Sequence, residues 1–226
     1  MKRIATLAGV VLAALAFSAP AHQGGEVQPA ALFVPPAPGT YALPPIQPVP
    51  EGKVLATTGA RHHLSDYTRG RITLLGLVYT RCADPEGCPI STWAFSSVRS
   101  LLRADPELER RARLVTLSFD PVHDRPAVMA AYDKRVRGTR AGAEWNFLTT
   151  ASRQALAPIL EGLDQDLRVA VDSRAVPGTE EFTHALKVFL IDAEGQVREI
   201  YSSGYLMPEM IVNDMRTLAG EVTRTR

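Results

Sequence analysis

The chain has 226 residues and a formal net charge of +1, from 25 basic and 24 acidic side chains. This length suits one ordinary domain with extensions, and the balanced charge leaves no electrostatic footprint for nucleic acid. Because 46% of the residues are hydrophobic, the chain can bury a core without disulfide staples. Its two cysteines therefore need another explanation.

The first 21 residues have the pattern of a secretory signal peptide. A basic pair at residues 2–3 precedes an apolar run from Ile4 to Phe17, and residues 19–21 have the small-x-small form of a cleavage site. The alternative is an uncleaved membrane anchor, but the run is shorter than the about 20 residues that span a bilayer. We therefore predict cleavage after Ala21 and export of a soluble product to an oxidising space, which in a bacterium is the periplasm.

Residues 22–57 are rich in proline and show little helical or alternating pattern. This composition predicts an extended linker or arm. Part of it, such as Tyr41 and Leu43, is expected to lie against the folded domain, which we place at residues 58–222.

Beyond the arm, apolar periodicity predicts strands and helices in alternation. Strands are expected at residues 72–80, 114–119, 145–148, 168–171, 185–191 and 197–201. Helices are expected from Pro89 to Leu102, from Pro126 to Val136 with a cap at Asp124, from Ser152 to Leu163 with a kink at Pro158, and from Pro208 to Leu218. Residues 172–183 read as a polar loop and 192–195 as a hairpin turn. This order predicts a single α/β domain with a mostly parallel sheet and an antiparallel hairpin at its edge.

Cys82 and Cys88 bracket the junction between the first buried strand and the helix that Pro89 opens. Open α/β sheets usually carry their sites at this carboxyl end of the strands. The helix dipole and the free N–H groups favour a thiolate at Cys88, so we expect its pKa to be lowered. Pro85 and Gly87 supply a bend that can bring the sulfurs together. Three interpretations stay open: a structural disulfide, a redox dithiol, and a pair of ligands for a soft metal. A disulfide that closes so short a loop adds little stability.

His184 is the third candidate, directly before the apolar run 185–191. A single histidine in a loop is commonly just hydrogen-bonded to the backbone. Two points favour His184 as a metal ligand. It begins the strand that a thioredoxin-type order would place beside the Cys82 strand, and a metal bound by only two soft ligands can accept a third. Cu(I) accepts two or three such ligands, and Cu(II) tolerates Cys and His together.

Three motifs in order resemble the Sco/SenC family over roughly residues 54–218: Leu-Leu-Gly-Leu-Val-Tyr-Thr-x-Cys…Cys-Pro (74–89), Ser-Phe-Asp-Pro-x-x-Asp-x-Pro (118–126) and His-x-x-x-x-x-Leu-Ile-x-x-x-Gly (184–195). The resemblance implies an exported or membrane-tethered protein with a thioredoxin-like fold. It also implies a copper site made of Cys82, Cys88 and His184. The implied role is to deliver copper to the binuclear copper centre of cytochrome c oxidase, or to reduce the cysteines of that centre.

The chain departs from the family pattern in two places. The family usually has three residues between its cysteines, with proline after the first, whereas five intervene here and Ala83 replaces that proline. The longer loop retains both cysteines but could change the ligand geometry, the redox potential or the choice of partner. The family also tends to have Asp directly before its histidine, where this chain has Thr183, which bears on the orientation of the imidazole.

Other side chains with possible chemistry have simpler interpretations. Asp120 and Asp124 flank Pro121 and His123 and could steer a metal or polarise a thiol, but they are better explained as a strand exit and a helix cap. Adjacent residues of an extended segment point to opposite faces, which separates His62 from His63. Helix packing explains Met207, Met210 and Met215, and core packing explains Trp93 and Trp145. After signal cleavage His22 would be the N-terminal residue, whose amine and imidazole could chelate Cu(II).

Several functions follow from these residues. The first is a copper metallochaperone that passes the ion to a copper-accepting respiratory protein or a cytochrome oxidase subunit. The second is a thiol–disulfide oxidoreductase that uses Cys82 and Cys88 without metal, together with a periplasmic thiol reductant. A peroxiredoxin is disfavoured because Tyr79 stands where such enzymes have threonine, and zinc hydrolysis because no carboxylate is clearly spaced as a general base. A structural or interaction module with the arm as a docking peptide remains the third class.

Overall fold

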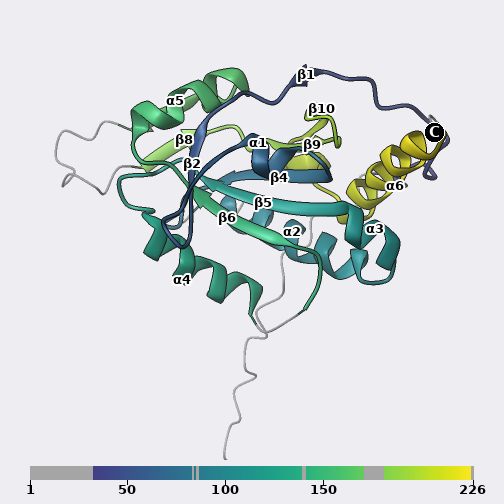
Figure 1. Ribbon diagram of the computed structural model, residues 1–226, viewed down its shortest axis with the longest axis horizontal. Coiled ribbons are helices and arrows are strands. Elements are labelled where there is room, and N and C mark those ends of the chain that lie inside the picture. The colour runs from purple at the N-terminus through teal and green to yellow at the C-terminus, as the bar shows by residue number, and fades with distance from the viewer. Residues whose placement is uncertain (1–32, 83, 85–86, 139–140, 171–180, 225–226) are drawn as a thin grey trace, which may run out of the picture.

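The computed structural model describes residues 33–82, 84, 87–138, 141–170 and 181–224. Within these residues the strands form one eight-stranded sheet, in the order β1-β10-β9-β4-β5-β6-β2-β3, and one two-stranded sheet. Helices cover the larger sheet on both sides, with α2 and α4 on one side and α5 on the other (Figure 1). The architecture is the mixed α/β fold that the alternation of elements predicts.

The centre of the sheet is made of three parallel strands: β4 (Ile72–Val78), β5 (Ala112–Ser118) and β6 (Trp145–Thr149). Every residue of β4 and β5 is buried, as expected for strands covered on both faces. The register pairs Val78 with Ser118. The last residues of β4 and β5 therefore lie side by side at the carboxyl edge of the sheet.

Antiparallel strands extend the sheet on both sides. On one side lie β9 (Val188–Ile191), β10 (Gln196–Tyr201) and β1 (Gln47–Pro48), and on the other lie β2 (Lys53–Ala56) and β3 (Arg61–His63). The predicted hairpin is β9–β10. In its turn Asp192 Oδ1 accepts from the N–H groups of Glu194 and Gln196 at 3.1 and 2.8 Å. Gly195 closes this turn with a φ of 85° that favours glycine.

The helices are α1 (Ser65–Thr68), α2 (Cys88–Leu102), α3 (Pro106–Arg111), α4 (Pro126–Arg137), α5 (Arg153–Gly162) and α6 (Pro208–Arg224), with a 3-10 turn, η1, at Ser203–Tyr205. Helix α6 packs beside α2. Proline stands in the first turn of α2, α3 and α4, where its missing N–H costs nothing. Pro158 lies inside α5, whose N-cap Ser152 accepts from Ala155 N–H at 3.1 Å. Within the described residues, none of the helices is both long and apolar enough to cross a membrane.

The two-stranded sheet corrects the expectation of a polar loop at residues 172–183 and of His184 as the start of the next strand. Strand β7 (Leu167–Ala170) pairs antiparallel with β8 (Glu181–His184), with Leu167 opposite His184. The end of the expected loop is therefore a strand, and residues 171–180 lie outside the described residues. His184 ends β8 instead of beginning β9, because pairing with β7 competes for the chain that precedes the apolar run.

The Pro-rich arm also differs from an independent linker. Strands β1 and β2 both lie within residues 22–57, so the sheet begins before the expected boundary at residue 58. The preceding chain is fixed to α6: Gly39 N–H donates to Thr217 Oγ1 at 2.9 Å, and Asn213 Nδ2 donates to the Pro36 carbonyl at 3.0 Å. Tyr41 donates to Asp214, and Leu43 is buried. The described part of the arm is thus packed on the domain.

The close approach of α2 to β4 depends on Gly76. A Cβ added there would lie 2.8 Å from Cζ of Phe95, a buried α2 side chain. We expect Gly76→Ala to lower the free energy of unfolding by about 1–3 kcal/mol because the core cannot take the extra methyl group. Urea denaturation measures this change. The control is Gly220→Ala, where a Cβ meets no atom within 4 Å and stability should stay level or rise. Equal effects of the two changes would contradict the packing argument.

Candidate metal and thiol centre

The two cysteines meet at the carboxyl edge of the sheet, as the sequence predicts. Cys82 follows the end of β4, and its N–H donates to the Tyr79 carbonyl at 3.1 Å in a tight turn. Cys88 is the first residue of α2, behind the N-cap Gly87, and is 3% exposed. Both are free thiols. Cys82 is partly exposed, so one sulfur faces solvent and the other lies in the core.

The two sulfurs differ in acidity because they share a hydrogen bond. The Cys88 thiol donates to the Cys82 sulfur and lowers the pKa of Cys82 to about 5, helped by main-chain N–H groups and the Tyr79 hydroxyl, although burial opposes the shift. The same hydrogen bond, together with burial, raises the pKa of Cys88. The expectation of a lowered pKa at Cys88 is therefore wrong. The main-chain N–H at the start of the helix does favour a thiolate, but that thiolate is Cys82. Cys88 keeps its proton because it donates that proton to Cys82 in the shared hydrogen bond.

Tyr79 connects the cysteines to the β7–β8 hairpin. Its hydroxyl donates to Cys82 and accepts from the main-chain N–H of Phe182, and burial with the nearby Cys82 charge raises the pKa of Tyr79 to about 12. The ring centroids of Tyr79 and Phe182 are 5.1 Å apart, and Phe119 packs against both at 5.2 and 5.4 Å. This aromatic cluster, Tyr79, Phe119 and Phe182, fixes β8 beside the Cys82 turn.

The main chain brings His184 toward the same edge. His184 stands two residues after Phe182, at the end of β8. Strand β9 runs antiparallel to β4 with Val188 opposite Gly76, so the chain just before β9 passes the carboxyl end of β4. The side chains of His184 and Thr183 lie outside the described residues. Among the side chains that are described, no three His, Cys, Asp or Glu residues form a group that could hold a metal ion, so the three-ligand set stays a prediction.

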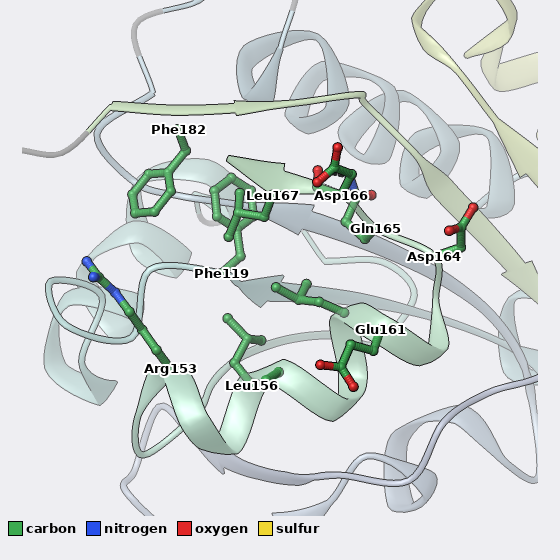
Figure 2. A pocket seen from close by; sticks show the side chains of 11 residues that line it. Phe119, Arg153, Leu156, Glu161, Asp164, Gln165, Asp166, Leu167 and Phe182 are labelled. Carbon is green, nitrogen blue, oxygen red and sulfur yellow. Dashed lines mark hydrogen bonds between the residues drawn. The ribbon is translucent and has the colours of Figure 1, made fainter. Parts of the chain in front are cut away.

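A cavity of about 720 Å³ opens beside Phe119 and Phe182 of the aromatic cluster (Figure 2). Phe119 and Phe182 form one wall, and Leu156 and Leu160 of α5 form the other. Sequence reasoning missed this cavity because its lining comes from segments that are distant in the sequence, and no local motif marks it.

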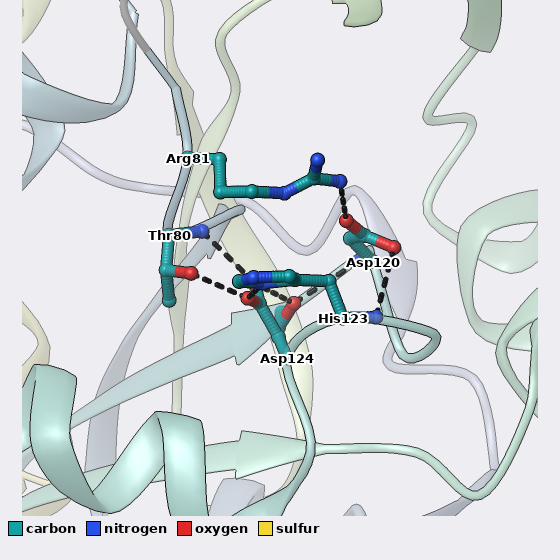
Figure 3. Close-up of polar contacts among 6 residues, drawn as sticks. Thr80, Arg81, Asp120, His123 and Asp124 are labelled. Atoms are coloured by element: carbon teal, nitrogen blue, oxygen red, sulfur yellow. Dashed lines mark hydrogen bonds and ion pairs between the residues drawn. The ribbon is translucent and has the colours of Figure 1, made fainter. Parts of the chain in front are cut away.

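A network of polar side chains binds Thr80 and Arg81, the two residues before Cys82 (Figure 3). Asp124 is fully buried and is bound by Thr80 and Ser118, while Asp120 pairs with Arg81 at 2.8 Å. The expectation that Asp124 caps a helix is wrong. The N-cap of α4 is Arg125, without a side-chain cap, because the Asp124 carboxylate points back to β4 and β5 instead.

The remaining candidates take structural roles where the structure describes them. Met207 and Met215 are buried and Met210 packs against the core. Trp145 is buried and donates from Nε1 to Thr116 Oγ1 at 2.9 Å, while Trp93 is partly buried against the core. His62 and His63 lie on β3, and His62 Nδ1 is 3.8 Å from Asp66. His22, Ala83 and Pro85 lie outside the described residues.

Comparison with known proteins defines the class and then the family. Solved structures with the same fold include ScoI of Bradyrhizobium japonicum with copper bound (TM-score 0.60, 19% identity, 74% of this chain and 97% of that chain covered). They also include yeast Sco1 with copper bound (TM-score 0.61, 15% identity, 80% of this chain and 95% of that chain covered). A third is a SCO1/SenC family lipoprotein of Bacillus anthracis (TM-score 0.64, 21% identity, 79% of this chain and 99% of that chain covered). The fold is thus the thioredoxin-like fold of Sco structures. A search of curated proteins finds no match.

The family model for SCO1/SenC matches residues 53–220. This protein belongs to the SCO1/SenC family. The match begins at β2, in agreement with a sheet that starts before residue 58.

The lowered pKa of Cys82 predicts selective alkylation. Only the thiolate reacts, so iodoacetamide should modify Cys82 at a constant rate near neutral pH, and the rate should halve near pH 5 as the sulfur is protonated. Cys88, buried and protonated, should react slowly. Mass spectrometry of the reduced protein after timed alkylation measures both rates.

The control is Cys88→Ala, which removes the proton donor and should move the Cys82 midpoint upward. A wild-type midpoint near the ordinary cysteine value of about 8.5 would contradict the shared hydrogen bond.

Proposed function

We propose that this protein is a copper-binding metallochaperone in which Cys82, Cys88 and His184 hold the ion. The observation that carries the proposal is the sulfur pair: two free sulfurs in hydrogen-bond contact, one with a pKa lowered to about 5. Soft sulfur ligands select Cu(I), and an added imidazole also suits Cu(II). The main-chain path of β8 and the Tyr79–Phe182 contact support His184 as the third ligand.

Copper capture and release follow from the different exposure of the two sulfurs. Cys82 already carries a negative charge near neutral pH, so it can bind copper first. The proton that Cys88 shares with Cys82 must leave when Cys88 binds, which makes loading release a proton. Because Cys82 is partly exposed, a partner's ligand can approach from that side and take the ion by exchange.

The proposed recipient is a respiratory copper centre such as that of cytochrome c oxidase. The support comes from relatives: the Bradyrhizobium and yeast proteins were solved with copper bound, and BsSco, a structural relative at 18% identity, belongs to the Sco family of cytochrome c oxidase assembly proteins. We further propose that residues 1–21 are removed as a signal peptide and that the protein acts in the periplasm, as the sequence pattern indicates.

A second function is supported by the same sulfurs. A partly exposed thiolate beside a buried thiol is the arrangement of a nucleophilic and a resolving cysteine. In this role the reduced pair gives two electrons and the Cys88 proton to a partner's disulfide, and water supplies the second proton. The partner leaves as a dithiol, and a periplasmic thiol reductant restores Cys82 and Cys88. A disulfide switch was identified in BsSco, which favours keeping this alternative.

Copper titration of the reduced protein tests the main proposal. We expect one copper per chain and, with Cu(II), a thiolate-to-copper charge-transfer band. Cys82→Ala and Cys88→Ala should abolish the band, because each removes one of the sulfurs. His184→Ala should weaken binding by at least about tenfold while leaving sulfur character.

The matched control is His63→Ala, which removes a histidine on β3 and should bind copper like wild type. Weak copper binding that none of the three ligand changes affects would rule out the chaperone. The reduction potential of the Cys82–Cys88 disulfide would then test the oxidoreductase. A potential too low for a cellular thiol reductant to open the disulfide would rule out that function as well.

A further inference from the structure

The residues directly before Cys82 are held by two buried carboxylates from the loop that joins β5 to α4 (Figure 3). The sheet ladder ends at Val78, whose carbonyl accepts from Phe119 N–H at 2.9 Å. Beyond Val78 the chain leaves the sheet, so Thr80 and Arg81 need other partners. They find them in Asp124 and Asp120, which we call the carboxylate clamp.

Asp124 grips Thr80 by both its main chain and its side chain. Asp124 Oδ2 accepts from Thr80 N–H at 2.9 Å and from the Ser118 hydroxyl at 2.6 Å, and Oδ1 accepts from the Thr80 hydroxyl at 2.5 Å. His123 Nδ1 is 2.9 Å from the same Oδ1. Because Asp124 is 0% exposed, any shift of its carboxylate would leave buried polar groups without partners, which is costly.

Asp120 holds the next residue. Its carboxylate, 1% exposed, pairs with Arg81 at 2.8 Å. The Ser118 hydroxyl accepts from Asp120 N–H at 3.0 Å while it donates to Asp124, so it links the Asp120 main chain to the Asp124 carboxylate. The two residues that precede Cys82 are thus each bound to a buried acid.

Cys82 depends on this clamp more than Cys88 does. Cys88 is part of a fifteen-residue helix that packs in the core, so its sulfur is placed by α2. Cys82 lies in neither a helix nor a strand. Its position relative to Cys88 is therefore set by the chain that leads to it, and that chain is fixed by Asp124 and Asp120.

We propose that Asp124 is a positioning residue for Cys82, supported by Asp120, which keeps the Cys82 sulfur within reach of Cys88. The consequence is a high effective concentration of one sulfur at the other, whether they are joined by copper or by a disulfide bond. The benefit for copper rests on the proposed function, whereas the effect on disulfide formation does not. The Ser-Phe-Asp-Pro-x-x-Asp motif then serves the thiol centre from a different loop.

The test is the equilibrium of the protein with glutathione, in the absence of copper. Reduced protein and glutathione disulfide give protein disulfide and two reduced glutathione molecules, so the constant reports how well the sulfurs are placed. Asp124→Asn keeps the shape but removes the charge that binds three donors. We expect the constant to fall by about tenfold, the effect of one weakened charge-assisted hydrogen bond.

The matched control is Asp214→Asn. Asp214 is also buried and accepts from the hydroxyl groups of Tyr201, at 2.6 Å, and Tyr41, but it contacts neither cysteine. Asp214→Asn should lower the free energy of unfolding and leave the glutathione equilibrium constant unchanged. If Asp124→Asn changes stability alone, as the control does, Asp124 has a structural role only and the proposal fails.

Two smaller changes keep the test decisive if Asp124→Asn does not fold. Ser118→Ala and Thr80→Val each remove one hydroxyl donor to Asp124, and each should lower the constant severalfold. If the equilibrium constant stays at the wild-type value in both variants, the proposal is overturned. Failure of the wild type to bind copper would remove the metallochaperone but leave this equilibrium as it is, so the two outcomes are separable.

Discussion

Both proposed functions depend on one hydrogen bond, from the buried thiol of Cys88 to the partly exposed sulfur of Cys82. It requires the two sulfurs to be in contact, and it divides their roles by charge: Cys82 becomes the thiolate and Cys88 keeps the proton. A metal that replaces this proton finds two sulfurs already gathered. An oxidant finds a nucleophile and its partner. Both proposed functions use the same preorganisation and differ only in what takes the place of the proton.

The rest of the fold maintains that contact from three directions. Helix α2 fixes Cys88, and Gly76 allows the helix to lie close to β4. The carboxylate clamp of Asp120 and Asp124 fixes the chain before Cys82. The Tyr79–Phe182 contact links the hairpin that carries His184 to the same sulfur. The five-residue loop between the cysteines can therefore be longer than in the family pattern without separating the sulfurs, because each sulfur is anchored outside that loop.

The features that could be predicted from the sequence are those encoded locally. The buried run of β4, Pro89 at the start of α2 and the β9–β10 turn each carry their own pattern, and they place both cysteines at the carboxyl edge. The features that could not be predicted depend on contacts distant in sequence. Strand β8 exists because β7 pairs with it, and Asp124 binds Thr80, which stands 44 positions earlier. The prediction of a lowered pKa at Cys88 was wrong for the same reason. A helix start in the sequence does not show which of two sulfurs donates the hydrogen bond and which accepts it.

X-ray absorption spectroscopy of the copper-loaded reduced protein tests most directly that both sulfurs and the imidazole bind one ion. The account predicts two sulfur scatterers and one imidazole nitrogen for each copper, with only the nitrogen lost in His184→Ala. A spectrum without sulfur ligands, or one that His184→Ala leaves unchanged, would contradict it.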